Sequence, residues 1–307
     1  MKLTVIVVCL CALLPAVASR SFANPSDAPP PKADRKQQAV TKHPNVRRDI
    51  EFGRVDGHAL KLDLFLPAET DRPVPCVVFV HGGGWLNGDK KSGERNAAWI
   101  TDHGFALASI NYRLTNVARW PAQISDCYAA VRWVRRHGEE YGIDPDRIGA
   151  WGSSAGGHLV ALMGTRTFPD HESTSSRVQA VCDWFGPSEL LTMPPNNVSE
   201  TRTADDVANS NGAKLLGATV RDVPELAKDA SALDQVSSDD AAFLIMHGDQ
   251  DPGVPLAQSE KLHQALLAAG VDSTLVVVQG AGHGGKEFHT DANRQQIIEF
   301  FSKHLRR

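Results

Sequence analysis

The chain has 307 residues, of which 42% are hydrophobic and 22% are charged. This is the composition of a globular protein with a large buried core, and it excludes disordered, collagen-like and disulfide-stapled chains. The net charge is −4, from 36 acidic and 32 basic residues, and no basic run is long enough to follow a phosphate backbone. We therefore expect no nucleic-acid partner.

The N-terminus has the pattern of a secretory signal. Lys2 precedes an apolar run at 3–14, which is followed by Pro15 and the small-residue sequence AVA at 16–18. The run is too short to span a bilayer, so we expect no membrane anchor. We assign residues 1–23 to a cleaved signal peptide, which predicts a secreted or periplasmic protein. A buried N-terminal helix is the alternative.

Residues 24–45 predict a flexible linker, because they contain PPP at 29–31 and scattered charges without apolar periodicity. One domain is then expected over 46–307. The run at 60–66 alternates apolar and polar residues, which favours an antiparallel edge strand. The run at 76–80 is continuously apolar, which is typical of a buried parallel strand.

The rest of the domain alternates strand-like and helical patterns. Further strands are predicted at 106–110, 147–151, 178–184, 242–246 and 274–278, and helices at 122–137 and 256–269. This order predicts an α/β fold, with a mostly parallel central sheet and helices on both faces. Residues 186–240 break the rhythm with several prolines, and we interpret them as an insertion that could form a cap.

Three cysteines, Cys76, Cys127 and Cys182, follow the predicted signal peptide. Each lies in an apolar stretch and none belongs to a C-x-x-C pair, so we expect buried thiols. Secretion permits disulfides, so one pair among the three is the alternative.

The sequence GSSAG at 152–156 is the strongest catalytic pattern. It follows the predicted strand at 147–151 and opens a helical stretch, which is the strand, sharp turn and helix context of a G-x-S-x-G nucleophile elbow. Only Ser154 sits centrally between the two glycines. We therefore predict Ser154 as the nucleophile.

A serine hydroxyl needs a base, and the base needs an orienting acid. His283 lies between two glycines after the strand predicted at 274–278, and Asp251 follows the strand at 242–246. The chain order of Ser154, Asp251 and His283 is that of an α/β-hydrolase fold. Asp249 competes for the acid role, but its place beside a glycine is explained by a turn, so Asp251 is preferred.

The glycine-rich sequence HGGGW at 81–85 directly follows the buried strand at 76–80. Glycines let backbone N–H groups approach the oxygen that becomes negative during acyl transfer. A phosphate-binding loop is the alternative, but it would require Gly-Lys-Ser/Thr at this point, and Trp-Leu follows instead. The pattern favours an oxyanion-binding loop, in which His81 holds the backbone by hydrogen bonding rather than binding a metal.

Several longer motifs resemble those of secreted bacterial carboxylesterases of the feruloyl-esterase-like (BD-FAE-like) α/β-hydrolase family, and more distantly those of hormone-sensitive-lipase-like esterases. The motifs are HGGGWLNGDK at 81–90, NYRL at 111–114, GIDPDRI at 142–148 and HGDQDPGVP at 247–255. The likeness covers residues 47–305.

The resemblance implies that Ser154 is the nucleophile, Asp251 the acid and His283 the base. It also implies an oxyanion hole formed by the N–H groups of Gly83, Gly84 and Ala155. No cofactor and no metal are implied. The expected activity is hydrolysis of carboxylic esters through an acyl-enzyme. The expected substrates are small acyl esters, in particular acetyl or feruloyl esters, including those on plant or algal polysaccharides.

Trp85 and Trp184 each follow a predicted strand closely, so either could line an acyl pocket or belong to ordinary packing. Two other functions remain open. A serine peptidase or amidase of the same fold is one, and a catalytically inactive hydrolase-fold binding protein is the other, although such a protein usually lacks a catalytic residue. The sequence does not specify the oligomeric state.

Overall fold

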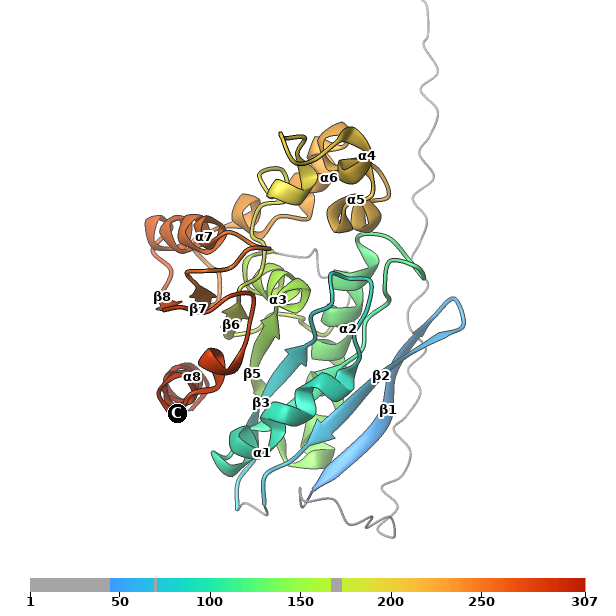
Figure 1. The fold of residues 1–307 in the computed structure, drawn as a ribbon. Coiled ribbons are helices and arrows are strands. Elements are labelled where there is room, and N and C mark those ends of the chain that lie inside the picture. The colour runs from blue at the N-terminus through green and yellow to red at the C-terminus, as the bar shows by residue number, and fades with distance from the viewer. Residues whose placement is uncertain (1–44, 69–70, 167–172, 307) are drawn as a thin grey trace, which may run out of the picture.

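The computed structural model describes residues 45–68, 71–166 and 173–306 (Figure 1). The predicted signal peptide at 1–23 and the predicted linker, apart from its last residue, lie outside the described residues. The domain expected from residue 46 onward begins with the first strand of the structure.

A sheet of eight strands forms the centre of the domain, in the order β1-β2-β4-β3-β5-β6-β7-β8. The six strands from β3 to β8 are mutually parallel, and β1 and β2 are antiparallel to their neighbours. The strands are β1 (Val46–Val55), β2 (His58–Phe65), β3 (Val74–Val80), β4 (Ala106–Ile110), β5 (Ile143–Ser153), β6 (Ala180–Trp184), β7 (Ala242–Gly248) and β8 (Ser273–Val278).

The strand predictions are confirmed with one exception. The apolar run at 76–80 is the buried parallel strand β3, and the alternating run at 60–66 is the antiparallel strand β2. The prediction that this second run forms the sheet edge is wrong, because β1 pairs along its outer side. Ile50 and Phe52 of β1 are buried against the core, which explains why this charged segment joins the sheet.

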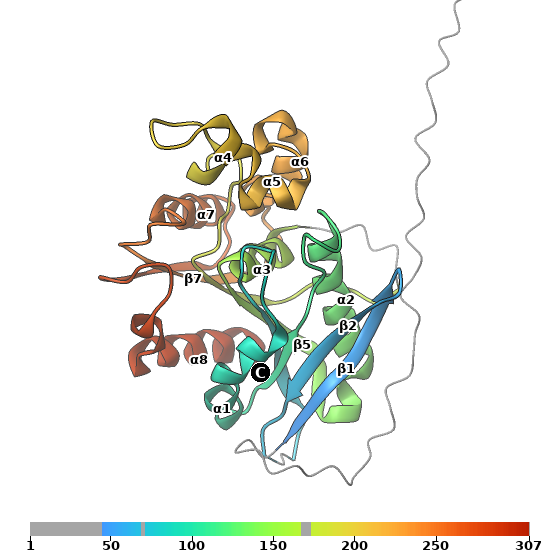
Figure 2. The ribbon, with the colours of Figure 1, turned by 45° about the vertical axis from the view of Figure 1, so that its right-hand side comes forward.

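Helices cover both faces of the sheet, as predicted (Figures 1 and 2). Side chains of α2, α3 and α7 enter one buried apolar cluster, and those of α1 and α8 enter a second. Neighbouring residues of β3 alternate between the two clusters, as the pleat of a strand requires. None of the helices in the described ranges combines the length and apolarity needed to cross a bilayer.

The helices differ widely in length. They are α1 (Glu94–Asp102), α2 (Ala122–His137), α3 (Ala155–Thr165), α4 (Ala204–Ala208), α5 (Asn211–Leu216), α6 (Pro224–Asp229), α7 (Leu256–Ala268) and α8 (Asp291–Leu305). The two helices predicted at 122–137 and 256–269 are confirmed as α2 and α7.

Cys76, Cys127 and Cys182 are buried and free, so the prediction of buried thiols is confirmed and none of the three is paired with another. Burial raises the pKa of the Cys76 thiol to about 12. It raises the pKa values of Cys127 and Cys182 well above the ordinary range. These thiols therefore act as small apolar core residues.

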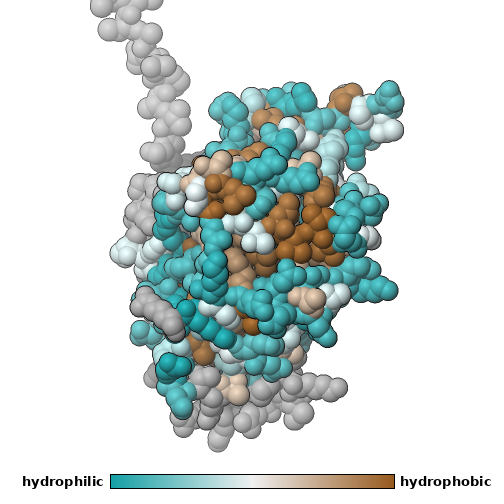
Figure 3. Space-filling view, turned by 90° about the vertical axis from the view of Figure 1, so that its left-hand side faces the viewer, coloured by the Kyte–Doolittle hydropathy of each residue, from teal (hydrophilic) through white to brown (hydrophobic). Residues whose placement is uncertain are grey.

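The sheet ends at β8, and the side of the molecule that carries this edge is shown in Figure 3. An apolar area lies in the middle of this side, surrounded by hydrophilic residues. Leu275, Val276 and Val277 of β8 are partly exposed, and Leu267 of α7 is 52% exposed. Part of the apolar surface of this outer strand thus remains accessible.

The segment between β6 and β7 contains α4, α5 and α6, which lie together at one end of the molecule beyond α3 (Figures 1 and 2). Asp229, at the end of α6, accepts a hydrogen bond from Trp120 Nε1 at 2.7 Å and forms an ion pair with Arg166 at 2.8 Å. These contacts fix the inserted segment to the helical layer that contains α2 and α3.

His158 connects this insertion to the region around Ser154. It lies on α3 and is completely buried. Its Nε2 donates to the carbonyl oxygen of Ala230 at 2.6 Å, while its Nδ1 accepts from Trp85 Nε1 at 3.2 Å. Burial lowers the pKa of His158 to about 4, so the ring is neutral at pH 7 and can accept at one nitrogen and donate at the other.

We predict that His158→Asn destabilises the protein less at pH 4 than at pH 7. The pKa of His158 is about 4 in the folded protein and 6.5 in the reference state. Between these values the unfolded chain binds a proton that the folded protein does not bind. The contribution of neutral His158 to the free energy of unfolding is therefore complete above pH 6.5 and is lost as the pH falls towards 4. The largest change in this free energy is about 3 kcal/mol.

Urea unfolding of both proteins at pH 4, 5.5 and 7 measures this effect, because the difference between them cancels the titration of all other groups. A difference in unfolding free energy that does not vary with pH would show that His158 is not held neutral.

Candidate active site

Ser154 lies in a sharp turn between β5 and α3. Its φ of 55° and ψ of −121° lie outside the regions that residues other than glycine usually adopt. Its N–H donates to the carbonyl oxygen of Trp184 at 2.8 Å. A Cβ atom at Gly156 would lie 2.1 Å from the carbonyl oxygen of Val80, so the helix after Ser154 can approach β3 only with glycine there.

The structure brings the three residues of the predicted constellation together. His283 Nε2 lies 2.7 Å from Ser154 Oγ, and His283 Nδ1 lies 2.6 Å from Asp251 Oδ2. The Asp251 side chain is fully buried, whereas the His283 side chain is 33% exposed. The imidazole therefore stands between a buried carboxylate and the Ser154 hydroxyl group.

Several hydrogen bonds keep Asp251 ionised. Burial alone would raise its pKa, but hydrogen bonds from His247 and His283 and from the amides of Val254 and Gly253 outweigh burial and lower the pKa. The two amides donate to Asp251 Oδ1 at 2.8 and 2.9 Å. With Asp251 ionised, His283 Nδ1–H donates to it, and Nε2 is left to accept the Ser154 hydroxyl proton.

Asp249 does not contact His283. Its Oδ1 accepts a hydrogen bond from the N–H of Gly280 at 2.7 Å, which is the turn role that its sequence position suggested. The geometry thus separates the two acid candidates, and it places Asp251 beside the imidazole.

His247 supports Asp251 from behind and was not singled out from the sequence. It is completely buried, with Nδ1 2.7 Å from Ser259 Oγ and Nε2 2.8 Å from the carbonyl oxygen of Val254. Its Nε2 also lies 3.4 Å from Asp251 Oδ2. The sequence signal that could have pointed to His247 is its position in HGDQD, as the last but one residue of β7.

The glycine loop after β3 lies against the turn that holds Ser154. A Cβ atom at Gly82 would lie 2.8 Å from the carbonyl oxygen of Ser153, so the two segments approach more closely than side chains allow. The described residues supply no hydrogen-bond acceptor to the amides of Gly83, Gly84 or Ala155. These three N–H groups are therefore available to a bound ligand.

His81 has contacts that suit a structural role. Its Nδ1 lies 2.7 Å from the carbonyl oxygen of Gly82, its ring stacks on Tyr112 at 4.4 Å, and its own carbonyl accepts from the Tyr112 hydroxyl at 3.1 Å. Across the described ranges, no group of three or more His, Cys, Asp or Glu residues is arranged to hold a metal ion.

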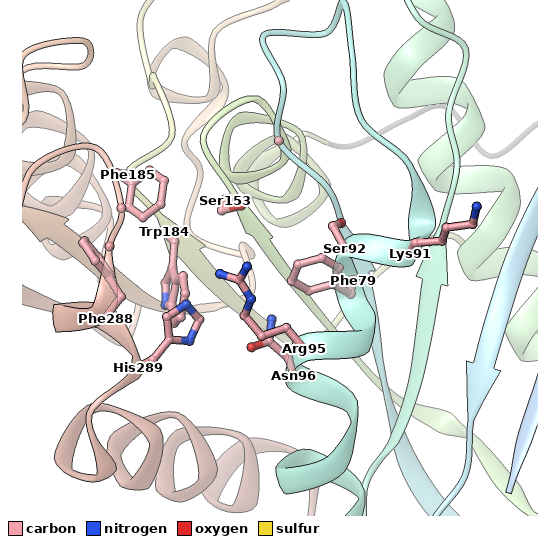
Figure 4. A pocket seen from close by; sticks show the side chains of 13 residues that line it. Phe79, Lys91, Ser92, Arg95, Asn96, Ser153, Trp184, Phe185, Phe288 and His289 are labelled. Atoms are coloured by element: carbon pink, nitrogen blue, oxygen red, sulfur yellow. The ribbon is translucent and has the colours of Figure 1, made fainter. Parts of the chain in front are cut away.

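A cavity of about 480 Å³ is lined by Gly82, Ser153 and Gly284, among other residues (Figure 4). Gly82 belongs to the glycine loop, and Ser153 and Gly284 are the chain neighbours of Ser154 and His283, so the cavity lies next to the constellation. Trp184 lines the cavity, and its role in substrate binding stays a prediction. Trp85 is not in its wall, because its indole is buried against His158. The structure therefore separates the two tryptophans that the sequence treated alike.

Phe185 is a further residue that sequence reasoning missed. Its φ is 44°, an unusual value for a bulky side chain, and its N–H donates to the carbonyl oxygen of Met246 at 2.9 Å. Its ring packs edge-on against the His283 ring at a centroid distance of 4.8 Å and lines the cavity. The strained backbone thus directs an aromatic ring towards His283.

Comparisons with known proteins agree with this architecture. A family model described as BD-FAE matches residues 62–266. Esterase LipQ of Mycobacterium tuberculosis is 33% identical over 275 residues, which cover 84% of this chain and 61% of LipQ. The structure of a truncated carbohydrate esterase from gut microbiota superposes with a TM-score of 0.74 at 31% identity, over 86% of this chain and 98% of that one.

A bifunctional GH43-CE protein of Bacteroides eggerthii also superposes with a TM-score of 0.74 at 30% identity, over 84% of this chain and 38% of its own. The chain spans about half to three fifths of the length of the curated relatives it matches. The structural neighbours confirm the predicted α/β-hydrolase fold. Because the family model matches more than half of the residues of this chain, the chain belongs to the BD-FAE family.

Proposed function

We propose that this protein is a serine hydrolase that cleaves carboxylic esters through an acyl-enzyme. The hydrogen-bonded series Ser154–His283–Asp251 carries the proposal, because it joins a hydroxyl group, a base and an ionised acid at 2.7 and 2.6 Å. The esterase relatives and carbohydrate-esterase neighbours support it.

In this reaction His283 Nε2 takes the proton of Ser154 as Oγ attacks the ester carbonyl carbon. The N–H groups of Ala155 and of Gly83 or Gly84 stabilise the oxyanion of the tetrahedral intermediate. The imidazolium, stabilised by Asp251, protonates the leaving alcohol, and an acyl ester on Ser154 remains. Water activated by His283 then releases the acid and restores the hydroxyl.

We propose small acyl esters as substrates, in particular acetyl or feruloyl esters, including esters carried by a polysaccharide. Similarity to a carbohydrate esterase from gut microbiota supports the polysaccharide connection. The aromatic residues of the cavity support a planar acyl group. The signal pattern at 1–23 supports a secreted or periplasmic location.

Removing the nucleophile gives the first test of this proposal. Ser154→Ala should lower kcat on any hydrolysed ester by about 10³-fold or more, because the covalent route is lost and only transition-state binding remains. Ser153→Ala, the adjacent change, should cause a much smaller loss. Steady-state kinetics on a 4-nitrophenyl ester measures both variants. A larger loss of kcat in Ser153→Ala than in Ser154→Ala would show that the nucleophile has been assigned to the wrong serine.

The two acid candidates are tested by a matched pair of substitutions. Asp251→Asn should lower kcat by about 10³- to 10⁴-fold, because the imidazole loses its orienting charge and its tautomer. Asp249→Asn keeps an oxygen for the Gly280 amide and should retain most activity. Equal losses in the two variants, with unchanged circular dichroism, would contradict the role given to Asp251.

The position of Trp184 predicts a selective effect on aromatic acyl groups. Stacking on an indole adds roughly 0.5–1.5 kcal/mol, from which an acetyl group gains almost nothing. Trp184→Ala should therefore reduce kcat/KM for a feruloyl ester by up to about tenfold more than for an acetyl ester. The ratio of the two constants is the readout, because it does not depend on the fraction of folded enzyme.

Trp85→Ala is the control for this measurement, because its indole packs against His158 outside the cavity wall. It should change both constants by the same factor. If Trp184→Ala also lowers kcat/KM by the same factor for the feruloyl and the acetyl ester, neither tryptophan contacts the acyl group.

A further inference from the structure

The cavity beside Ser154 contains a cation that ester hydrolysis itself does not require. Arg95 extends from the first turn of α1, and Figure 4 shows its guanidinium directed into the space between Phe79 and Trp184. Lys91 also belongs to the lining, but its side chain points away from the middle of the cavity. The positive charge inside the cavity is therefore that of Arg95.

No carboxylate in the part of the chain that the structure describes forms an ion pair with this guanidinium. The acid next to Arg95 in the chain, Glu94, is paired with Arg48 at 2.6 Å. Within the described ranges, Arg95 has no ion-pair partner, and none of the residues that line the cavity is acidic. Glu287 lies beside the lining residue Gly285 but does not itself belong to the lining.

Two further polar atoms of residues that line the cavity lack hydrogen-bond partners. Asn96 Oδ1 and His289 Nδ1 are buried, and neither has a partner among the described residues. Burial and the charges of Arg95 and Arg294 lower the pKa of His289, which places its ring in the positive field of Arg95. Both atoms are closed off from solvent, so the charged group that the cavity offers to a ligand is the exposed guanidinium of Arg95.

The remaining walls are aromatic and suit a ring. Phe79, Trp184, Phe185 and Phe288 line the space around Arg95 (Figure 4). Flat apolar walls with a guanidinium between them match a ring that carries a carboxylate. The rings offer stacking surface, and a guanidinium binds a carboxylate through two parallel hydrogen bonds.

We propose that this cavity is a subsite for a carboxylate-bearing ring of the ester substrate, with Arg95 as the residue that binds the carboxylate. The inference rests on the proposed esterase function and specifies its substrate class. The ring belongs either to the acyl group or to the alcohol group of the ester, because the cavity adjoins Ser154 and can receive either.

Two pairs of small esters test the proposal and distinguish these two positions. Monomethyl terephthalate and its neutral analogue methyl 4-carbamoylbenzoate place the charge on the acyl side. The pair 4-acetoxybenzoate and 4-acetoxybenzamide places it on the alcohol side. The quantity measured is the ratio of kcat/KM for the charged ester to that for the neutral ester at pH 7 and low salt.

Arg95→Gln should reduce this ratio by about tenfold in one of the two pairs, because a charge-assisted interaction is replaced by a neutral one. The intrinsic reactivity of each ester cancels when the same pair is compared between native and variant protein. Arg54→Gln is the control, because Arg54 lies on β1 in an ion pair with Glu51, outside the cavity. It should leave both ratios unchanged. Ratios that Arg95→Gln also leaves unchanged in both pairs would overturn the subsite.

Calorimetry separates this inference from the proposed function. The Ser154→Ala protein should bind the charged ester of the responsive pair, and the additional Arg95→Gln change should weaken this binding by about tenfold. Equal binding with and without Arg95 would overturn the subsite even if the native protein hydrolyses the neutral esters. A third outcome is that the native protein hydrolyses none of the four esters, but Arg95→Gln still weakens binding of a charged ester to the Ser154→Ala protein. This outcome would support the subsite and contradict the esterase proposal.

Discussion

The close contact between the Ser154 turn and its two neighbouring segments determines the geometry of the whole site. The turn is held by the hydrogen bond from the Ser154 N–H to Trp184, and it can approach the adjacent backbone only because Gly156 and Gly82 lack side chains. Its unusual φ directs the Ser154 side chain towards His283, while the amide of Ala155 is left free at the start of α3. A side chain at either glycine would displace both groups at once.

Most of this site could be predicted from local sequence, because its parts follow parallel strands directly. Ser154, Asp251 and His283 each come shortly after a strand with a continuous apolar run, and the carboxyl ends of such strands meet at one edge of the sheet. The inner strands β3, β4 and β6 were predictable because a strand buried on both faces has no polar alternation. The glycine loop after β3 follows this rule too.

Other features depend on contacts between distant segments and left no pattern in the sequence. The cavity combines side chains from α1, from the end of β6 and from the turn before α8, so neither Arg95 nor His289 could be assigned to it beforehand. The helices α4, α5 and α6 have five or six residues each, too few for a periodic apolar face. β1 carries charged residues that hide its two buried side chains, so the sheet edge was placed one strand too early.

The central claim is that esters are cleaved through an acyl group on Ser154. Rapid mixing with a 4-nitrophenyl ester, followed by acid quenching and peptide mass spectrometry, tests it most directly. The account predicts a burst of about one equivalent of nitrophenol per active site and an acyl group on the peptide that contains Ser154, located at that residue by fragmentation. Steady hydrolysis without an acylated peptide, or an acyl group on another residue, would contradict it.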